Sequence, residues 1–125
     1  MQNYLLESSP KSPLIDARPT GEILIDGICI PEDVQKLFEP FITWLNEYCK
    51  SPANKTVLTV KLAYFNTSTA AVLLAVFRIL AKLKLMGNEA VINWYFEEGD
   101  LEIEDSGHDY AGLIDTEFNV LSYVK

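Results

Sequence analysis

The fold is decided by the stretch TVLTVKLAYFNTSTAAVLLAVFRILAKLKLMGN, residues 56–88. Its first ten residues alternate in hydrophobicity, which predicts a strand over 56–65. The side chains on the apolar side of that strand are Leu58, Val60, Leu62 and Tyr64. A helix is predicted from Ser68 to Met86, apolar nearly all round in its first half and stopped by Gly87-Asn88. The stretch therefore predicts a buried strand followed by a buried helix.

Apolar runs upstream predict a hairpin and a further helix. Runs at 14–15 and 23–25 are separated by a turn-forming Pro-Thr-Gly sequence. A helix is expected from Pro31, because proline suits the first helical position and the acidic Glu32 and Asp33 follow at the positive end of the helix dipole. Its apolar residues recur at spacings of three and four: Val34, Leu37, Phe38, Phe41, Leu45, Tyr48 and Cys49.

The complete pattern predicts an α/β fold. Strands are expected over 89–96 and 118–124, with a weak helix over 101–113, so the order is β-β-α-β-α-β-(α)-β. Strands joined through helices run parallel. Only one strand face is consistently apolar, whereas a sheet covered on both faces reads as continuous apolar runs. We therefore predict a two-layer sandwich with helices mainly on one face of a mixed sheet, preceded by a loose polar segment, residues 1–12.

Composition and charge exclude several classes of function. The chain of 125 residues has 10 basic and 18 acidic residues and a net charge of −8, which argues against nucleic acids and anionic membranes as partners. Cys29 and Cys49 lie in apolar runs without metal-site spacing, and we expect buried free thiols. The N-terminus lacks the features of a signal peptide, and no apolar run spans a bilayer. We expect a cytoplasmic protein without metal or cofactor.

The residues needed for catalysis are not evident. His108 is the single histidine and lies in a loop-like stretch, so we expect a solvated surface residue and no base for a nucleophile. Segment 97–117 has nine acidic residues and no lysine or arginine, which indicates a solvated surface or a partner-facing patch. It is not a calcium loop, because the glycine required at the sixth position is absent. We therefore expect a protein that is not an enzyme.

Three consecutive hydroxyl residues, Thr67, Ser68 and Thr69, follow Asn66 where the central strand gives way to the helix. One such residue suffices to cap a helix by accepting a backbone N–H, so capping explains the segment only in part. The positive end of a helix also attracts anions. A phosphate there would carry about −1.5 to −2 charges and be partly stabilised by the helix. A plain cap and a phosphorylation site both stay open at this point.

Several segments, taken in order, resemble the SiaC-type family of bacterial regulatory phosphoproteins. They are the hairpin, Ile30-Pro31-Glu32, Phe38–Leu45, Tyr64–Ser68, Asn93–Glu98 and the closing acidic segment. The resemblance runs from about residue 12 to 123. It implies a fold similar to STAS domains, with residues 13–125 as a single STAS-like domain, and a non-enzymatic partner switch.

The resemblance also implies partners and a modification site. Family members are phosphorylated by a dedicated Ser/Thr kinase and dephosphorylated by a PP2C-type phosphatase. The unphosphorylated form binds and activates a diguanylate cyclase, which promotes cyclic-di-GMP signalling and biofilm formation. The family phosphoacceptor, the threonine of an Asn-Thr-Ser motif, maps onto Thr67. Asn66 and Ser68 match the flanking positions, Thr69 stands where a serine is common, and these three residues are expected on the partner surface near the switch. The acceptor position of the wider STAS family, offset by one, would be Ser68.

Two other hypotheses follow from the same residues. The chain could be a constitutive adaptor in which Asn66, Thr67 and Ser68 only cap a helix. It could also be a small-molecule-binding or enzymatic domain that uses the hydroxyl cluster and the acidic run, although no base or metal set supports that. If segment 97–117 borders the Thr67 end of the sheet, a phosphate would add charge to an already negative surface.

Overall fold

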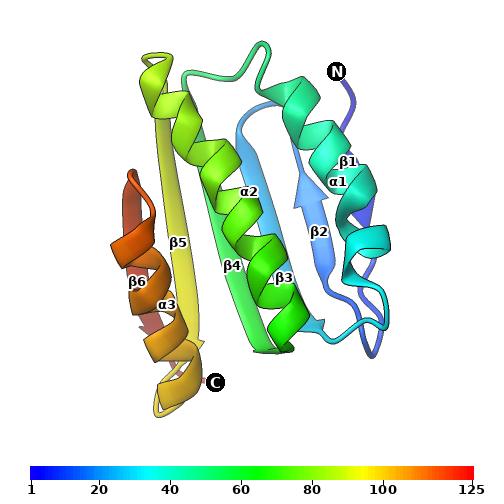
Figure 1. Cartoon of the computed structure of the whole chain (residues 1–125), viewed down its shortest axis with the longest axis vertical. Coiled ribbons are helices and arrows are strands. Elements are labelled where there is room, and N and C mark those ends of the chain that lie inside the picture. Colours follow the sequence, from blue (N-terminus) through cyan, green and yellow to red (C-terminus); the bar gives the residue numbers. More distant parts are fainter.

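The computed structural model describes residues 1–125 as a six-stranded sheet with three helices. The elements are β1 (Tyr4–Leu6), β2 (Leu14–Ala17), β3 (Glu22–Cys29), α1 (Val34–Tyr48), β4 (Lys55–Phe65), α2 (Thr67–Leu85), β5 (Glu89–Glu97), α3 (Leu101–Leu113) and β6 (Glu117–Tyr123). The strands lie side by side in sequence order (Figure 1). The pairs β1–β2 and β2–β3 are antiparallel, whereas β3 to β6 are parallel. The predicted mixed α/β sheet is therefore confirmed.

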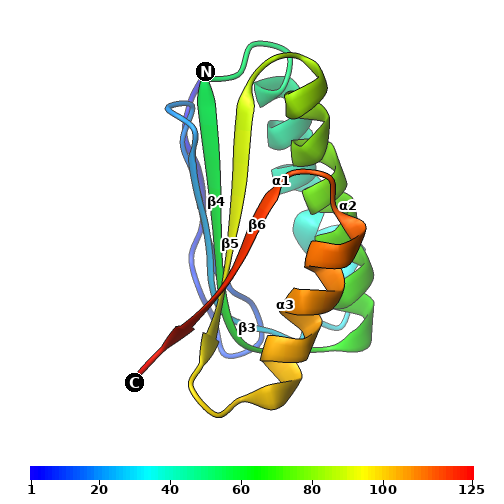
Figure 2. The same ribbon diagram turned by 90° about the vertical axis from the view of Figure 1, so that its left-hand side faces the viewer.

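All three helices cover the same face of the sheet (Figure 2), which confirms the predicted two-layer arrangement. A cluster of 25 buried residues fills the space between the layers. Its largest fully buried side chains are Trp94, Tyr48, Phe38, Phe41 and Phe77. None of the three helices combines the length and the hydropathy that crossing a membrane would need.

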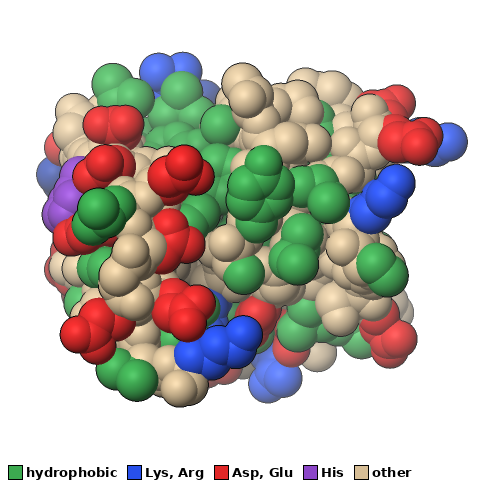
Figure 3. All heavy atoms as spheres, turned by 90° about the horizontal axis from the view of Figure 1, so that it is seen from below, with side chains coloured by type: hydrophobic (Ala, Val, Ile, Leu, Met, Phe, Trp, Pro, Cys, Tyr) green, Lys and Arg blue, Asp and Glu red, His purple; other side chains and the backbone are tan.

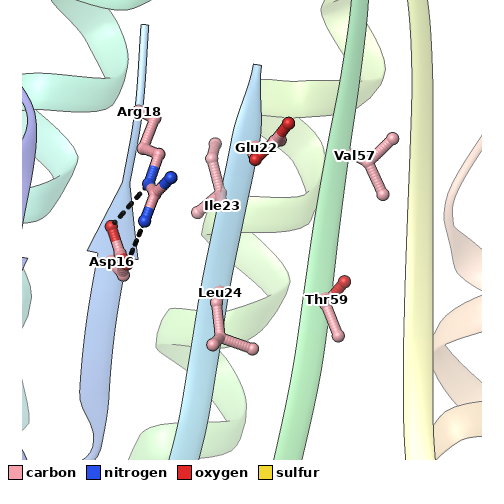
Figure 4. Close-up of a pocket in the computed structure, with 7 residues that line it drawn as sticks. All are labelled: Asp16, Arg18, Glu22, Ile23, Leu24, Val57 and Thr59. Atoms are coloured by element: carbon pink, nitrogen blue, oxygen red, sulfur yellow. Dashed lines mark hydrogen bonds and ion pairs between the residues drawn. The ribbon is translucent and has the colours of Figure 1, made fainter. Parts of the chain in front are cut away.

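The opposite face of the sheet carries no helix. Figure 4 shows a shallow pocket on it, where residues 22–24 of β3 lie between Asp16 and Arg18 on one side and Val57 and Thr59 of β4 on the other. The guanidinium of Arg18 lies 3.4 Å from the Asp16 carboxylate. Such a solvent-accessible ion pair contributes little to stability. This pocket lies at the amino ends of β3 and β4, away from the residues that follow β4.

The N-terminal segment differs from the prediction. Residues 4–6 form β1 and pair antiparallel with β2, so residues 1–12 are not loose throughout. The indole nitrogen of Trp44 donates a hydrogen bond to the carbonyl oxygen of Gln2 at 2.8 Å, and the ring of Tyr4 packs 5.9 Å from that of Phe41. A three-residue strand is too short to show periodicity, and its packing partners are distant in sequence.

Helix α1 begins at Val34, later than the predicted start at Pro31. Asp33 is its N-cap and accepts a hydrogen bond from the backbone N–H of Lys36 at 3.1 Å. The acidic residues therefore precede the first turn, where their charge still meets the positive end of the dipole. Pro40 lies inside α1 on its exposed face, where water can satisfy the carbonyl that its missing N–H leaves free.

The alternation along β4 breaks at Tyr64. In the pairing with β3, Gly27 faces Leu62 and the next residue, Ile28, faces Tyr64, so Ala63 is an extra residue in a β-bulge. The bulge leaves Tyr64 54% exposed and turns Phe65 toward the core. The prediction that Tyr64 shares the apolar side of the strand is therefore wrong, because a bulge shifts every later side chain by one position.

Helix α2 agrees with the prediction at both ends. Asn66 is the N-cap, and the helix closes at Gly87, whose φ of +83° only glycine adopts easily. The backbone N–H of Asn88 donates to the carbonyl of Leu83 at 3.1 Å, which satisfies one of the orphan carbonyls of the last turn. The last turn carries Lys82 and Lys84, suited to the negative end of the dipole.

Candidate functional site

The three helices begin at one end of the molecule, beyond the carboxyl ends of β3, β4 and β5 (Figure 1). The loops that follow the parallel strands meet at this end of the sheet, so the residues in them lie close together. The segment Asn66–Thr69 lies at this end and starts α2. The structure therefore places the predicted hydroxyl cluster at the carboxyl end of the parallel strands, next to the starts of α1 and α3.

Asn66 alone provides the cap of α2. Its side-chain oxygen accepts a hydrogen bond from the backbone N–H of Thr69 at 3.0 Å and from the hydroxyl of Ser68 at 3.2 Å. Its side-chain nitrogen donates to the carbonyl of Pro31 at 3.5 Å, which ties the cap to the segment before α1. The cap therefore requires no hydroxyl from Thr67.

Thr69 is a structural residue. It is 0% exposed, and its hydroxyl lies 2.6 Å from the side-chain oxygen of Asn66 and 3.2 Å from the carbonyl oxygen of Cys29 in β3. The expectation that Thr69 lies on the partner surface is therefore wrong. A signal was present in the sequence: Thr69 shares the spacing of the buried Val72, Leu73 and Val76, and so belongs to the core-facing side of α2.

Both cysteines are free thiols, as predicted, but the prediction that both are buried holds for Cys29 alone. Cys29 is buried, and its sulfur lies 3.4 Å from the Thr69 hydroxyl. Burial raises the pKa of the Cys29 thiol, with the Thr69 hydrogen bond opposing this in part. Burial likewise raises the pKa of Cys49, which is only partly buried. Neither sulfur is therefore activated as a nucleophile.

Thr67 and Ser68 are the accessible hydroxyls of the cluster. Ser68 donates its hydroxyl hydrogen to Asn66, whereas the hydroxyl of Thr67 takes no part in the cap. Thr67 is the first residue of the 19-residue α2, whose first turn has no acidic residue. The positive end of this helix is therefore not compensated by a carboxylate of its own.

A groove runs from Thr67 between the first half of α2 and α3. Its lining is mostly apolar and includes Phe65, Ala70, Leu74, Tyr110 and Leu113, the last of which is 61% exposed. A second depression joins it at Thr67 and includes Tyr64 and Glu102. The sequence did not reveal this groove, because its two walls are separated by a whole strand.

The acidic segment borders this groove, as the sequence hypothesis required. Glu102 and Asp109 of α3 line the two depressions that contain Thr67. Asp100 caps α3 by accepting from the backbone N–H of Ile103 at 3.1 Å. Figure 3 views this end of the molecule and shows acidic side chains gathered on one side, near the single histidine, next to hydrophobic side chains in the middle. The groove is therefore apolar with a negative rim.

Helix α3 is held firmly against the start of α2. The indole nitrogen of Trp94 donates to the carbonyl of Ile103 at 2.9 Å, and the phenol of Tyr110 donates to the carbonyl of Ala70 at 2.7 Å. Burial raises the pKa of Tyr110 to about 12. Gly107 lies against the Trp94 ring so closely that a β-carbon there would collide with it. The acidic rim is therefore fixed relative to Thr67.

Outside this groove the structure offers little catalytic chemistry. His108 lies on the surface, as predicted, with its side chain 60% exposed and its Nε2 atom 3.5 Å from a carboxylate oxygen of Glu104. No group of three His, Cys, Asp or Glu side chains is placed to hold a metal ion. An accessible hydroxyl beside an apolar surface is better suited to modification and binding than to catalysis.

Comparisons with known proteins identify a family for this chain. The family model described as SiaC family regulatory phosphoprotein matches residues 6–123. No curated protein matches the chain in sequence.

Three solved structures are similar in fold. SiaC of Pseudomonas aeruginosa has a TM-score of 0.89 at 18% identity, with 98% of this chain and 100% of that chain covered. Apo-SiaC of the same organism has a TM-score of 0.88 at 17% identity, covering 97% and 99%. A chain of the complex of diguanylate cyclase SiaD with its activator SiaC, also from Pseudomonas aeruginosa, has a TM-score of 0.90 at 16% identity, covering 96% and 99%.

Proposed function

The chain belongs to the SiaC family of regulatory phosphoproteins, and we propose that it is a partner switch controlled by phosphorylation of Thr67. A separate Ser/Thr kinase adds the phosphate, and a PP2C-type phosphatase removes it. The unphosphorylated form binds and regulates a diguanylate cyclase, and thereby cyclic-di-GMP signalling and biofilm formation. The cyclase is proposed because SiaC, which shares this fold, forms a solved complex with the diguanylate cyclase that it activates.

One observation carries the choice of Thr67. It is the accessible hydroxyl at the start of α2 that the cap does not use, and it lies in the same groove as Glu102 and Asp109. Ser68 is the alternative acceptor, but its hydroxyl donates to Asn66. A kinase must break that hydrogen bond to use Ser68, whereas the Thr67 hydroxyl is free of the cap.

Two electrostatic effects oppose each other at Thr67. The positive end of α2 stabilises an anion by about 0.3–1 kcal/mol at an exposed site. Covering the phosphate with an apolar partner costs several kcal/mol, because a charge loses its water. The carboxylates of Glu102 and Asp109 in the same groove repel the phosphate, and together with it they repel any partner that has its own acidic groups. The phosphate therefore costs the complex more free energy than it costs the free protein.

The test is binding of the purified chain to the diguanylate cyclase encoded in the same genome. Thr67→Ala should bind like the wild type, whereas Thr67→Asp should bind at least about tenfold more weakly, the equivalent of roughly 1.4 kcal/mol. Thr43→Asp is a matched control, because Thr43 is an exposed threonine on α1, outside the groove. If Thr67→Asp binds like Thr43→Asp, Thr67 is not the switch.

Phosphopeptide mass spectrometry on protein from its native cell separates the remaining hypotheses. Phosphate on Thr67 supports the proposal, and phosphate on Ser68 moves the acceptor by one residue. A complete lack of phosphate under all growth conditions favours a constitutive adaptor. The adaptor hypothesis needs Asn66, Thr67 and Ser68 only as a helix cap, a role for which Asn66 suffices.

A further inference from the structure

Strand β6 is an uncovered edge of the sheet. Its only neighbour is β5, and Figure 2 looks at the free side directly. Natural edge strands are protected by being short, by charges, by proline or by bulges. The other edge, β1, has three residues. In contrast, β6 has seven, and residues 118–124 contain no charge and no proline.

The direction of the free backbone groups follows from one hydrogen bond. The carbonyl of Tyr123 accepts from the backbone N–H of Glu98, so Tyr123 points its backbone groups toward the β5 side. Backbone groups alternate in direction along a strand. Phe118, Val120 and Ser122 therefore point theirs outward, and Val124 continues this set beyond the end of β6.

We propose that two copies of the chain pair through β6, antiparallel, about a twofold axis at Leu121, to form one continuous sheet. In this register Val120 lies opposite the partner's Ser122, and Phe118 lies opposite the partner's Val124. Residues whose backbone N–H and C=O groups point outward thus lie opposite residues of the same kind in the partner. Each such pair exchanges two backbone hydrogen bonds. Identical surfaces that complement themselves about a twofold axis are the usual basis of homodimers.

The charges at the ends of the segment select this register. Glu117 lies opposite the partner's Lys125, and the symmetry repeats the pair. Leu121, which is 37% exposed, meets its own copy at the axis. An axis at Val120 would also match the backbone, but it would place Glu117 opposite the partner's Tyr123. The sequence from Glu117 to Lys125 is therefore complementary to itself in charge as well as in backbone direction.

The acidic α3 does not oppose the pairing. Its groove side, with Glu102 and Asp109, faces α2. Residues 104 and 108 lie on the opposite side of the helix by its spacing. Trp94 pairs with Val120 and packs under Gly107, so α3 passes the level of the axis between residues 104 and 108. Across the axis, Glu104 faces the partner's His108, and the two helices present unlike groups.

The experiment is analytical ultracentrifugation of the full chain over a wide range of concentrations. The wild type should show a monomer–dimer equilibrium. Leu121→Lys places two ammonium groups opposite each other, and the dimer dissociation constant should rise at least about tenfold. Leu5→Lys is the matched control, because Leu5 is an exposed leucine on the other edge strand. It should leave the equilibrium unchanged.

Two further variants test the pairing and its register. Ser122→Pro removes an outward N–H and no bond to β5, so circular dichroism should report a folded monomer. Lys125→Glu should weaken the dimer severalfold, and Glu117→Lys with Lys125→Glu should restore it. A wild type that stays monomeric at every concentration overturns the proposal. So does a Leu5→Lys variant as impaired as Leu121→Lys, or a charge swap that restores nothing.

Discussion

The starts of α2 and of its two neighbours share a geometry and differ in charge. Asp33 and Asp100 cap α1 and α3, each accepting a backbone N–H at 3.1 Å, and Asn66 caps α2 at 3.0 Å. A carboxylate at a helix N-terminus is worth about 0.3–1 kcal/mol more than a neutral group. Helix α2 forgoes that gain although it is the longest of the three. Of the three helix starts, it is the one suited to receive a negative charge from outside.

Helix α3 represents the opposite extreme. Its first turn adds Glu102 and Glu104 to the capping Asp100. The uncompensated start of α2 thus lies beside the most acidic helix start of the molecule. Under the proposed function, the neutral start of α2 receives the phosphate on Thr67, and the carboxylates of α3 repel it. Four substitutions test how the helix starts differ.

Gly107→Ala should have the largest effect. Its new methyl group collides with the Trp94 ring, and overpacking of this kind costs about 1–3 kcal/mol. Because α3 must move, the distance between the two helix starts changes as well. Thermal unfolding should show a clear loss of stability. Gly112→Ala is the control, since nothing lies within 4 Å of its β-carbon, and it should stabilise α3 by up to about 1 kcal/mol.

Asn66→Ala should lower the free energy of unfolding by more than Asp33→Ala does, although Asn66 carries no charge. The side-chain oxygen of Asn66 serves the backbone of Thr69 and also the hydroxyl of Ser68, whereas Asp33 accepts from Lys36 alone. The substitution also leaves the buried hydroxyl of Thr69 with one fewer partner. We expect about 2 kcal/mol against about 1 kcal/mol in urea unfolding. Equal losses would show that the cap of α2 is no more than an ordinary cap.

Tyr110→Phe should cost about 0.5–1.5 kcal/mol at neutral pH, because the hydrogen bond to the Ala70 carbonyl is lost. It should also change the alkaline limb of the stability curve. The pKa of Tyr110 is raised to about 12 in the folded state, so its contribution is complete below pH 10 and is lost as the pH rises through about 12. The variant should therefore lose less stability than the wild type across that interval. Parallel curves would contradict the burial of the phenol.

Asn66→Asp should have the smallest effect, and it makes the start of α2 resemble the other two. At neutral pH the helix dipole favours the new carboxylate by about 0.3–1 kcal/mol, but the substitution also removes the side-chain N–H that donates to the Pro31 carbonyl. The net change in stability should therefore be smaller than the dipole gain. A phosphate on Thr67 should then be more destabilising than in the wild type, because a carboxylate already occupies the positive end. The measurement is the difference in melting temperature between the phosphorylated and unmodified forms of each protein. An unchanged difference would show that the dipole of α2 has no part in holding the phosphate.

The position of Thr67 could be predicted from the sequence, because the change from an alternating strand pattern to a helical pattern occurs between residues that are neighbours in the sequence. The exposure of Tyr64 could not, since it depends on a bulge whose register is set by β3. The groove beside Thr67 likewise depends on contacts between residues far apart in sequence, such as Gly107 with Trp94. The signals in the sequence conflicted for Thr69. Its spacing indicated a buried side chain, whereas its polarity indicated an exposed one. Local patterns revealed the elements, and long-range packing determined what each element exposes.

The order of the strands in the sheet also bears on how the chain folds. Every strand pairs with the strand that precedes it in the sequence, from β1 to β6. No strand has to be inserted between two others that have already paired. The sheet can grow by adding one strand, or one helix and strand, at a time to a free edge, and each addition closes a short loop. During synthesis the ribosome delivers these units in the order in which they are needed, so the chain can fold from its N-terminus while it emerges.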